Sequence, residues 1–322
     1  MHHWINRALR TALLLVFTLS LAACGQAAST NQASNNNANQ PSAAPSEGEI
    51  TVTDAQGTVT LPKTPSRIIT MDFSFTDMLV TLGVQPVGIA DDDSPELFMD
   101  SVKSQLTDYT SVGSRYEPNI ELVSSLKPDL IIADINKHKN AITQMQAIAP
   151  VLVLDDFQAD YDQMLKNYAI IAKAVGKEEE GKKRLQEHEA KMAEAKSKIK
   201  SNNLTVLPAV VNPKGFFGHS DHSYTGSVLA ELGFADPVKH DESYPQLTLE
   251  QLVETNPQAL FLMPTEEVTI VNQWETNPLW QKIDAVANNN VYKVERRNWA
   301  LSRGMLGSEK IAEDIVNQLG EK

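Results

Sequence analysis

Basic side chains concentrate in a few short stretches of this sequence, although the chain as a whole is acidic, with a formal net charge of −13. An arginine can bind two carboxylate oxygens at once through its planar guanidinium group, so clustered basic residues suit the recognition of a carboxylate-bearing anion. The candidates come from the segments "SVGSR", "INKHKN" and "VERRNWALSRGM", and they are Arg115, Lys137, His138, Arg297 and Arg303. These residues indicate an anion-binding site assembled from distant parts of the chain.

The first three candidates stand where predicted strands end. Arg115 precedes Pro118, and Lys137 and His138 follow the apolar run 130–133. Ligands of open α/β folds bind at the carboxyl ends of the strands, which favours a site there. For Lys137 and His138, a solvated helix start is an equally good account.

Two histidines stand three residues apart in the segment "GFFGHSDHSYTG", at His219 and His222, with Asp221 and Tyr224 beside them. Imidazole and carboxylate groups are common metal ligands. Two histidines in a predicted loop define no coordination geometry, so we expect no metal site here. Because the segment follows a predicted strand, we expect His219 and Tyr224 to face a bound ligand instead.

The acidic balance of the chain argues against nucleic acid as a partner. No G-x-S-x-G, H-E-x-x-H or phosphate-binding loop motif occurs, and no acid–base pair stands out by spacing. We therefore expect a binding protein rather than an enzyme.

Short apolar runs alternate with helical patterns on both sides of a charged central segment, which indicates an α/β architecture. A β-hairpin is predicted around the turn 54–57. The predicted strands are 68–71, 87–90, 130–133, 151–154, 206–211, 259–263 and 291–294. The predicted helices are 75–82, 118–126, 224–232, 249–255 and 308–319.

The central segment 159–200 is predicted to be helical and to join two lobes. An apolar face runs from Tyr161 to Val175, Gly176 fits a helix end, and the charged stretch after it has only a narrow apolar stripe. A surface helix within a single domain is the alternative.

The amino terminus has the features of a secretory leader. Arg7 and Arg10 precede an apolar run that ends at small residues. The single cysteine, Cys24, follows Leu-Ala-Ala and resembles the lipidated cysteine of a bacterial lipobox. We therefore expect a lipoprotein signal peptide over 1–23. The polar segment 24–49 is expected to be a flexible tether, because it lacks the large apolar residues that folding requires.

Two pairs of segments echo each other across the central helix. "IELVSSLKPDLII" and "TLEQLVETNPQALFL" both place a glutamate before a leucine at a helix start, at Glu121 and Glu250. "FTDMLVTLGV" and "YTGSVLAELGF" form the second pair. Such internal similarity indicates two related lobes.

With its lipobox, tether, two lobes and central helix, the chain resembles the substrate-binding lipoproteins of iron–siderophore ABC importers, and within them the ferric dicitrate-binding branch. The segments "SVGSRYEPNIELVSSLKPDLIIAD", "YTGSVLAELG", "NPLWQKIDAV" and "NWALSRG" carry the resemblance. It implies an α/β fold of two Rossmann-like lobes, 50–158 and 201–322, joined by a long backbone helix.

The resemblance also implies roles for individual residues. Arg115 matches a ligand-contacting basic residue of the family, and Trp299 and Arg303 match its W-A…R-G pattern. The alternative for this stretch is that Trp299 belongs to the core and the arginines pair with surface acids. Glu121 and Glu250 match the glutamates that dock against arginines of the membrane permease, although both could simply be acids favoured by the helix dipole.

The expected ligand is a ferric chelate, iron(III) citrate above all, with no resident cofactor. The expected partners are the permease and ATPase of an ABC importer. A monomer is expected at the extracytoplasmic face of a bacterial membrane, anchored through palmitate-type lipidation of Cys24. Three alternatives stay open: a receptor for another ferric siderophore, haem or a corrinoid; a receptor for bare metal ions; and an extracellular enzyme.

Overall fold

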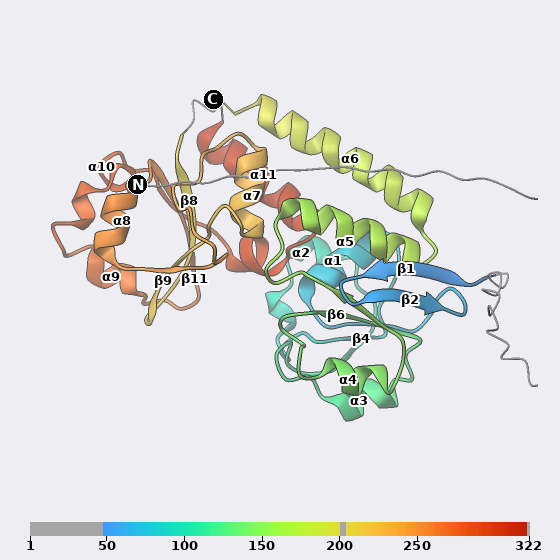
Figure 1. The fold of residues 1–322 in the computed structure, drawn as a ribbon. Coiled ribbons are helices and arrows are strands. Elements are labelled where there is room, and N and C mark those ends of the chain that lie inside the picture. Colours follow the sequence, from blue (N-terminus) through green and yellow to red (C-terminus); the bar gives the residue numbers. More distant parts are fainter. Residues whose placement is uncertain (1–47, 200–203, 321–322) are drawn as a thin grey trace, which may run out of the picture. The chain divides into compact units, whose positions relative to one another are not determined.

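A computed structural model describes residues 48–199 and 204–320 (Figure 1). The chain divides into the units Met1–Ala44 and Pro45–Lys322, and every described residue belongs to the second. The predicted signal peptide, Cys24 and most of the predicted tether lie outside the described residues. None of the described helices is both long and apolar enough to cross a membrane.

The predicted hairpin is confirmed. Strand β1 (Ile50–Asp54) pairs antiparallel with β2 (Gly57–Leu61), with Asp54 opposite Gly57. The Asp54 carboxylate accepts the backbone N–H groups of Gln56 and Gly57, which closes the turn. Gly57 has a φ of +134°, a conformation that costs glycine little because it lacks a Cβ atom.

The first half of the chain forms an all-parallel sheet of five strands in the order β5-β4-β3-β6-β7. Its strands are β3 (Ile68–Thr70), β4 (Gly88–Ile89), β5 (Thr110–Ser111), β6 (Leu130–Asp134) and β7 (Val151–Leu154). Helices α1 (Phe73–Thr81), α2 (Asp100–Lys103), α3 (Ile120–Ser125) and α4 (Ile142–Gln146) and the 3-10 turn η1 (Pro95–Leu97) accompany it. Every residue of β6 and of the edge strand β7 is buried, as expected for parallel strands covered on both faces.

The second half forms a mixed sheet in the order β10-β9-β8-β11-β12. Its strands are β8 (Val206–Asn212), β9 (Gly215–Gly218), β10 (Gln246–Leu247), β11 (Ala259–Pro264) and β12 (Val291–Lys293). β8, β11 and β12 run parallel, whereas β9 and β10 are antiparallel additions. The predicted loop at His219 and His222 is confirmed, but it follows β9, which turns back along β8 and ends at Gly218.

Helices of this half are α7 (Tyr224–Glu231), α8 (Leu249–Thr255), α9 (Ile270–Trp274), α10 (Asp284–Ala287) and α11 (Met305–Leu319), with the 3-10 turn η2 (Trp280–Lys282) and the π-helical turn η3 (Arg297–Leu301). Helix α8 begins and ends where the sequence predicts. Its start is fixed by a capping box in which Thr248 and Gln251 bind each other's backbone N–H groups.

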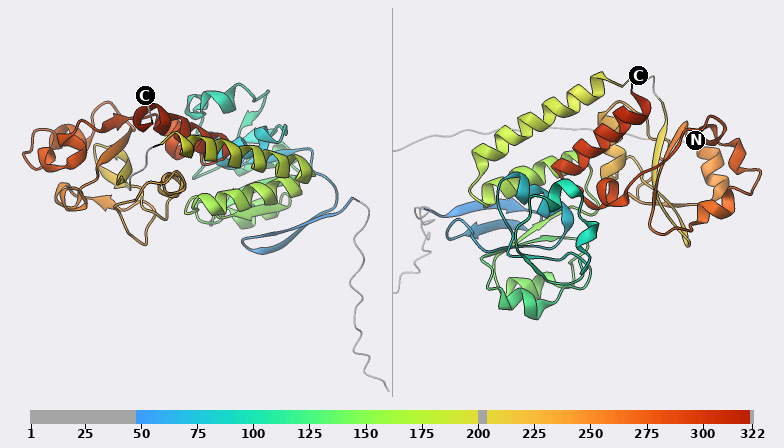
Figure 2. Two further views of the ribbon diagram at one scale, coloured as in Figure 1. Left: turned by 90° about the horizontal axis from the view of Figure 1, so that it is seen from above. Right: turned by 180° about the vertical axis from the view of Figure 1, so that it is seen from behind.

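Segment 159–200 contains two helices, α5 (Tyr161–Ala174) and α6 (Glu178–Ser197). Gly176, with a φ of +69°, lies in the turn between them. Helix α6 contacts both α5 and α11, and the three helices lie side by side in the two views of Figure 2. Met192 supplies part of the buried edge of α6.

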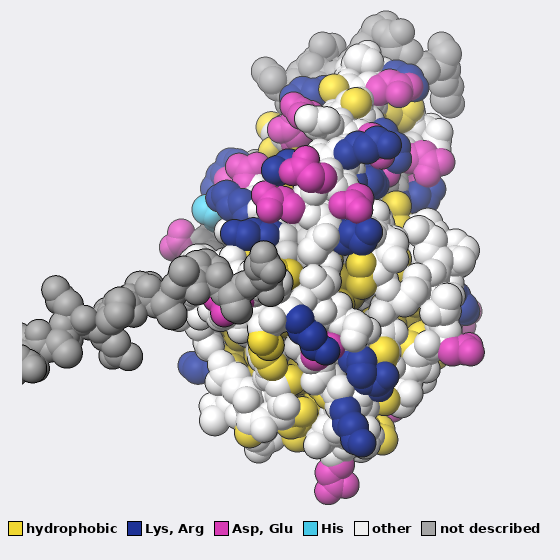
Figure 3. Space-filling view, turned by 90° about the vertical axis from the view of Figure 1, so that its right-hand side faces the viewer, with side chains coloured by type: hydrophobic (Ala, Val, Ile, Leu, Met, Phe, Trp, Pro, Cys, Tyr) yellow, Lys and Arg dark blue, Asp and Glu magenta, His cyan; other side chains and the backbone are white. Residues whose placement is uncertain are grey.

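The remaining faces of α6 are solvated and carry ion pairs such as Lys182–Glu178 and Lys198–Glu194. Acidic and basic side chains intermingle on the upper part of Figure 3, the level at which α6 lies in Figure 1.

Candidate functional site

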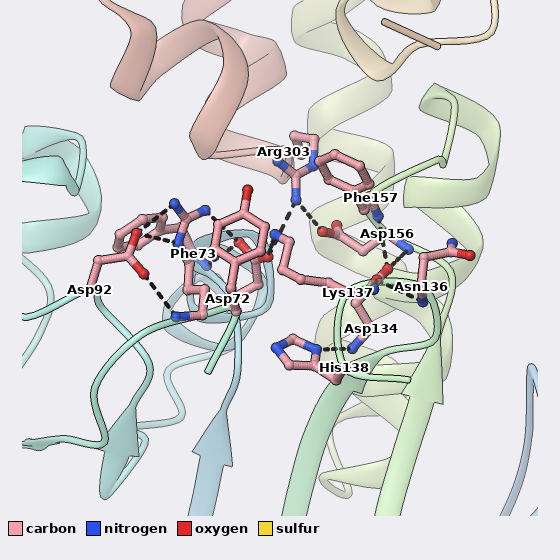
Figure 4. A network of polar contacts seen from close by, with 12 residues as sticks. Asp72, Phe73, Asp92, Asp134, Asn136, Lys137, His138, Asp156, Phe157 and Arg303 are labelled. Atoms are coloured by element: carbon pink, nitrogen blue, oxygen red, sulfur yellow. Dashed lines mark hydrogen bonds and ion pairs between the residues drawn. The ribbon is translucent and has the colours of Figure 1, made fainter. Parts of the chain in front are cut away.

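A pocket lies where loops of the two lobes meet, and side chains of both lobes line it. It has a volume of about 180 Å³. Its lining consists of basic, aromatic and aliphatic side chains: Arg115, Tyr116, Lys137, Phe157, Val210, Phe217, His219, Tyr244, Arg296, Ala300, Leu301 and Arg303. The volume is below the roughly 300–1,000 Å³ of ordinary small-molecule sites. A polar network holds three of its cationic side chains against carboxylates of the protein (Figure 4).

Asp72 is the centre of this network. It follows β3, is fully buried, and accepts the N–H of Phe73 to begin α1. Three cations face its carboxylate: the ammonium group of Lys137, Arg115 Nη1 at 3.4 Å and Arg303 Nη2 at 3.5 Å. Burial alone would raise the pKa of Asp72, but these three charges together hold that pKa far below its ordinary value. Asp72 is therefore an anion that binds cations of both lobes.

Arg115 is held in place by a second carboxylate. Asp92 accepts the Arg115 side chain at Nε (2.9 Å) and Nη2 (2.7 Å), and it also accepts the Arg115 backbone N–H. The guanidinium carbon lies 4.4 Å from the centre of the Phe73 ring, within the range of a cation–π contact. Arg115 is thus fixed on three sides before any ligand arrives.

Asp134, at the carboxyl end of β6, shapes the two loops that carry Lys137 and Asp156. Its carboxylate accepts backbone N–H groups of both loops, from Asn136, Lys137, Asp156 and Phe157. Asp156 in turn accepts Arg303 Nη2 at 2.5 Å across the lobes. The strand ends of the first lobe therefore position the partners of a cation that belongs to the second.

Aromatic rings form the remaining wall. Phe157 and Tyr244 lie 5.4 Å apart, ring centre to ring centre, and the Tyr244 hydroxyl donates to the Phe157 carbonyl. The Lys137 ammonium lies 5.2 Å from the rings of both Tyr116 and Phe157. Flat apolar faces beside fixed cations suit a compact organic anion.

His219 and His222 lie in different environments. His219 is buried in the pocket wall, edge-on to Tyr244, and its Nδ1 has no hydrogen-bond partner within the described chain. Burial first, and then the charges of Arg303 and Arg296, lower the pKa of His219 to about 3, so the ring is neutral. His222 is exposed. Across residues 48–199 and 204–320, no group of three or more His, Cys, Asp or Glu is arranged to hold a metal ion.

Four of the residues predicted to bind ligand do not line the pocket. Tyr224 is buried and its hydroxyl donates to the Gly304 carbonyl. Trp299 is fully buried, lies parallel to Phe261 at 4.8 Å, and donates its indole N–H to Asp314. Their polar atoms are already bound within the protein.

Arg297, the third, reaches across to the first lobe. It donates to both carboxylate oxygens of Asp100, at 2.9 and 3.2 Å, and to the Phe98 carbonyl. His138 is also absent from the lining. It is buried beneath Lys137 (Figure 4), and its Nδ1 accepts the N–H of Asp134.

Sequence reasoning missed Asp72, Tyr116, Asp156 and Phe157. All four follow carboxyl ends of parallel strands, so the rule that directed attention to Lys137 could have found them. Tyr244 carries no comparable signal, because it precedes a short antiparallel strand.

Glu121 and Glu250 occupy matching places. Each is exposed in the first turn of its helix, after the capping residues Asn119 and Thr248 respectively. No ion pair of either glutamate is recorded with another described residue.

Comparison with known proteins gives a family and close relatives. The family described as periplasmic binding protein matches residues 68–297. The Fe(3+)-citrate-binding protein YfmC of Bacillus subtilis (strain 168) is 38% identical over 317 residues, which cover 98% of this chain and 100% of YfmC. The Fe(3+) dicitrate-binding periplasmic protein FecB of Escherichia coli (strain K12) is 39% identical over 267 residues, covering 83% of this chain and 89% of FecB.

Among solved structures, Staphylococcus aureus SirA complexed with staphyloferrin B is similar with a TM-score of 0.75 at 26% identity. That match covers 84% of this chain and 98% of the SirA chain.

Proposed function

Because the chain belongs to the periplasmic binding protein family, we propose that it is an extracytoplasmic receptor for an anionic ferric chelate, and for ferric citrate in particular. Relatives that match 98% and 83% of its length are named for binding ferric citrate and ferric dicitrate, respectively. The family and these relatives are binding proteins, and we propose no catalytic role.

The observation that carries the proposal is the convergence of Arg115, Lys137 and Arg303 on one pocket between the lobes. Citrate presents several carboxylates, which arginine binds with paired hydrogen bonds. A bound chelate would draw cations from both lobes onto one anion, so binding would favour closure of the lobes around it.

A second candidate is a ferric siderophore with an aromatic chelating group. It is favoured by the wall of Phe157, Tyr244 and Tyr116, which offers ring faces as well as charges. Haem is a further possible ligand of such a wall.

One titration separates these ligands. Trp274, Trp280 and Trp299 are the fluorescent reporters, since the fourth tryptophan, Trp4, lies in the predicted leader. The protein would be titrated with ferric citrate, a ferric hydroxamate, a ferric catecholate and haem, with iron-free citrate, Zn²⁺ and Mn²⁺ as controls. We expect the tightest binding for ferric citrate. Saturable binding of bare Zn²⁺ or Mn²⁺ without response to any chelate would favour the metal-receptor alternative.

Delivery is the second part of the proposal. We propose that the receptor hands its chelate to the permease of an ABC importer, which an ATPase drives. Glu121 on one lobe and Glu250 on the other would pair with permease arginines, so that docking depends on the spacing of the lobes. Lipidation of Cys24, followed by the tether up to residue 49, would keep the lobes 50–158 and 201–322 near the membrane.

A further inference from the structure

The buried carboxylates of the network differ in how much each depends on one cation. Asp134 is held by four backbone N–H groups, and Asp72 by one backbone N–H and three cations. The Asp156 carboxylate has a single recorded donor in the part of the chain that the structure describes, Arg303 Nη2 at 2.5 Å. If Arg303 turns to another anion, Asp156 alone loses its partner.

Arg303 is also the basic side chain that the second lobe contributes to the network around Asp72. Its Nε is buried and has no hydrogen-bond partner among the described residues. The guanidinium group is therefore incompletely bound by protein, although it lines the pocket. A ligand oxygen that approaches it meets a cation already paired with Asp156.

We propose that Asp156 is the internal counter-ion that the ligand replaces at Arg303, and that Asp156 takes up one proton from solvent when the ligand binds. The ion pair between Arg303 and Asp156 breaks, and a new one forms between Arg303 and an anionic oxygen of the ligand. The Asp156 carboxylate becomes a carboxylic acid. This inference rests on the proposed function, because it needs an anionic ligand in this pocket.

The surroundings of Asp156 favour this exchange. The titratable groups that face it come from both lobes: Asp72, Asp134, Lys137, Tyr244 and Arg303. Burial raises the pKa of Asp156, and Arg303 is the strongest opposing charge. Asp72 and Asp134 raise that pKa further, while the ammonium group of Lys137 is already bound to Asp72. Once a ligand anion neutralises Arg303, little is left to keep Asp156 ionised.

The ion pair between Arg303 and Asp156 also stabilises the ligand-free protein. A buried guanidinium without a partner is strongly destabilising, and Asp156 supplies the shorter of the two ion pairs of Arg303. The consequence is competition, since the ligand must displace a carboxylate that is held at 2.5 Å. As pH falls, protonation of Asp156 removes the competitor, so ligand affinity should rise with acidity. Affinity should change over a pH window that lies between the pKa values of Asp156 in the free and the ligand-bound protein.

Calorimetric titration of the whole protein with ferric citrate tests the proposal. Titrations at one pH in buffers of different ionisation enthalpy give the number of protons taken up on binding. Ferric citrate exchanges protons of its own, so the informative quantity is the difference between wild type and Asp156→Asn. The matched control is Asp100→Asn, which alters another aspartate–arginine pair across the lobes, outside the pocket.

We expect wild type and Asp100→Asn to take up about one proton more than Asp156→Asn. Relative to Asp156→Asn, their affinity should fall by up to about tenfold per pH unit as pH rises through the window. Equal proton uptake in wild type and Asp156→Asn would overturn the proposal.

A spectroscopic measurement covers the case in which Asp156→Asn does not fold. Gallium(III) citrate is a diamagnetic substitute for the ferric complex, so aspartate labelled with ¹³C at the side-chain carboxyl can be followed by NMR. One buried carboxyl resonance should move from the carboxylate to the carboxylic-acid position on binding. Absence of any such shift in the saturated protein would contradict the proposal. Binding of none of the chelates would instead defeat the proposed function itself.

Discussion

The carboxylate of Asp77 caps the first turn of α11 from the other lobe. It accepts the backbone N–H groups of Leu306 and Gly307, each at 3.1 Å, across a sequence separation of 230 residues from Gly307. The cap residue of α11, Gly304, has no side chain for this task. A Cβ atom there would lie only 2.4 Å from the Asp77 carboxyl carbon. Helix α1 thus supplies the cap, and the glycine leaves room for it.

This cap predicts a pH effect on stability. Burial raises the pKa of Asp77 to about 7, although the two N–H groups oppose the rise. In the unfolded chain the pKa of this carboxyl is near its ordinary value of 3.8. Between pH 3.8 and about 7, the folded protein therefore keeps a proton that the unfolded chain releases. The free energy of unfolding should fall as pH rises from about 4 to 7, by at most about 1.4 kcal/mol per unit from this group. Asp77→Asn should remove that slope in urea titrations, and an unchanged pH profile would contradict the assignment.

Glu309 should act in the opposite direction. It accepts Arg184, His188 and Lys191 side chains of α6, and although burial opposes the shift, these contacts lower its pKa to about 2. Its contribution is present above pH 4.5 and lost as pH falls through 2. Glu309→Gln should therefore cost about 1–3 kcal/mol at pH 7, and the difference should shrink in acid.

The control for this prediction is Glu313→Gln on the same helix, α11. Its partner, Lys310, lies one turn away, and the Glu313 side chain is 62% exposed. Its effect should stay below about 0.5 kcal/mol. Equal losses in the two variants would mean that Glu309 does not join α6 to α11.

Loss of a pocket arginine should weaken ligand binding. Arg115→Ala and Arg303→Ala should each cost about 1.5–3 kcal/mol in ferric citrate binding, since each removes hydrogen bonds to a charged group. This corresponds to roughly tenfold to a hundredfold in affinity, measured by fluorescence titration. Melting curves must accompany the data, because Arg303→Ala leaves the buried Asp156 unpaired and Arg115→Ala removes the side-chain partner of Asp92. Arg297→Ala should matter less, since Arg297 binds Asp100 outside the pocket. Unchanged affinity in both pocket variants would place the ligand elsewhere.

The glutamate pair should matter for uptake and not for binding. Glu121→Ala and Glu250→Ala should leave ferric citrate affinity intact and reduce iron uptake by cells, and the double variant should reduce it further. Lysine at either position should be worse than alanine, because it would repel a permease arginine. Glu254→Lys is the matched control, an exposed glutamate near the end of α8. Normal uptake by the double lysine variant would show that the pair only favours helix starts.

Anchoring is tested at Cys24. Cys24→Ala should release the protein into the medium or leave it unprocessed, because only cysteine supplies the thioether to the lipid. Ligand affinity should not change. Lipid-labelled protein that persists in this variant would rule out the lipobox assignment.

Local pattern was enough to predict the alternation of strands and helices. Buried parallel strands such as β6 and β7 read as continuous apolar runs, and α8 carries its start signal in Thr248 and Gln251. The same pattern placed Arg115 and Lys137 after the ends of predicted strands. Since parallel strands bring their carboxyl ends to one edge of a sheet, this predicted that the two residues lie at one site.

Other features depend on contacts between residues far apart in the chain. Asp156 and Arg303 are 147 positions apart, and neither sequence neighbourhood reveals that one neutralises the other. Arg297 and Trp299 are sequence neighbours of the pocket residues Arg296 and Ala300, yet neither lines the pocket. The reason is that successive side chains of a helical turn point in different directions. Periodicity is a local property and can be read along the chain. The pairing of buried charges is set by which loops the packed helices α1, α5 and α11 bring together, and that required the folded molecule.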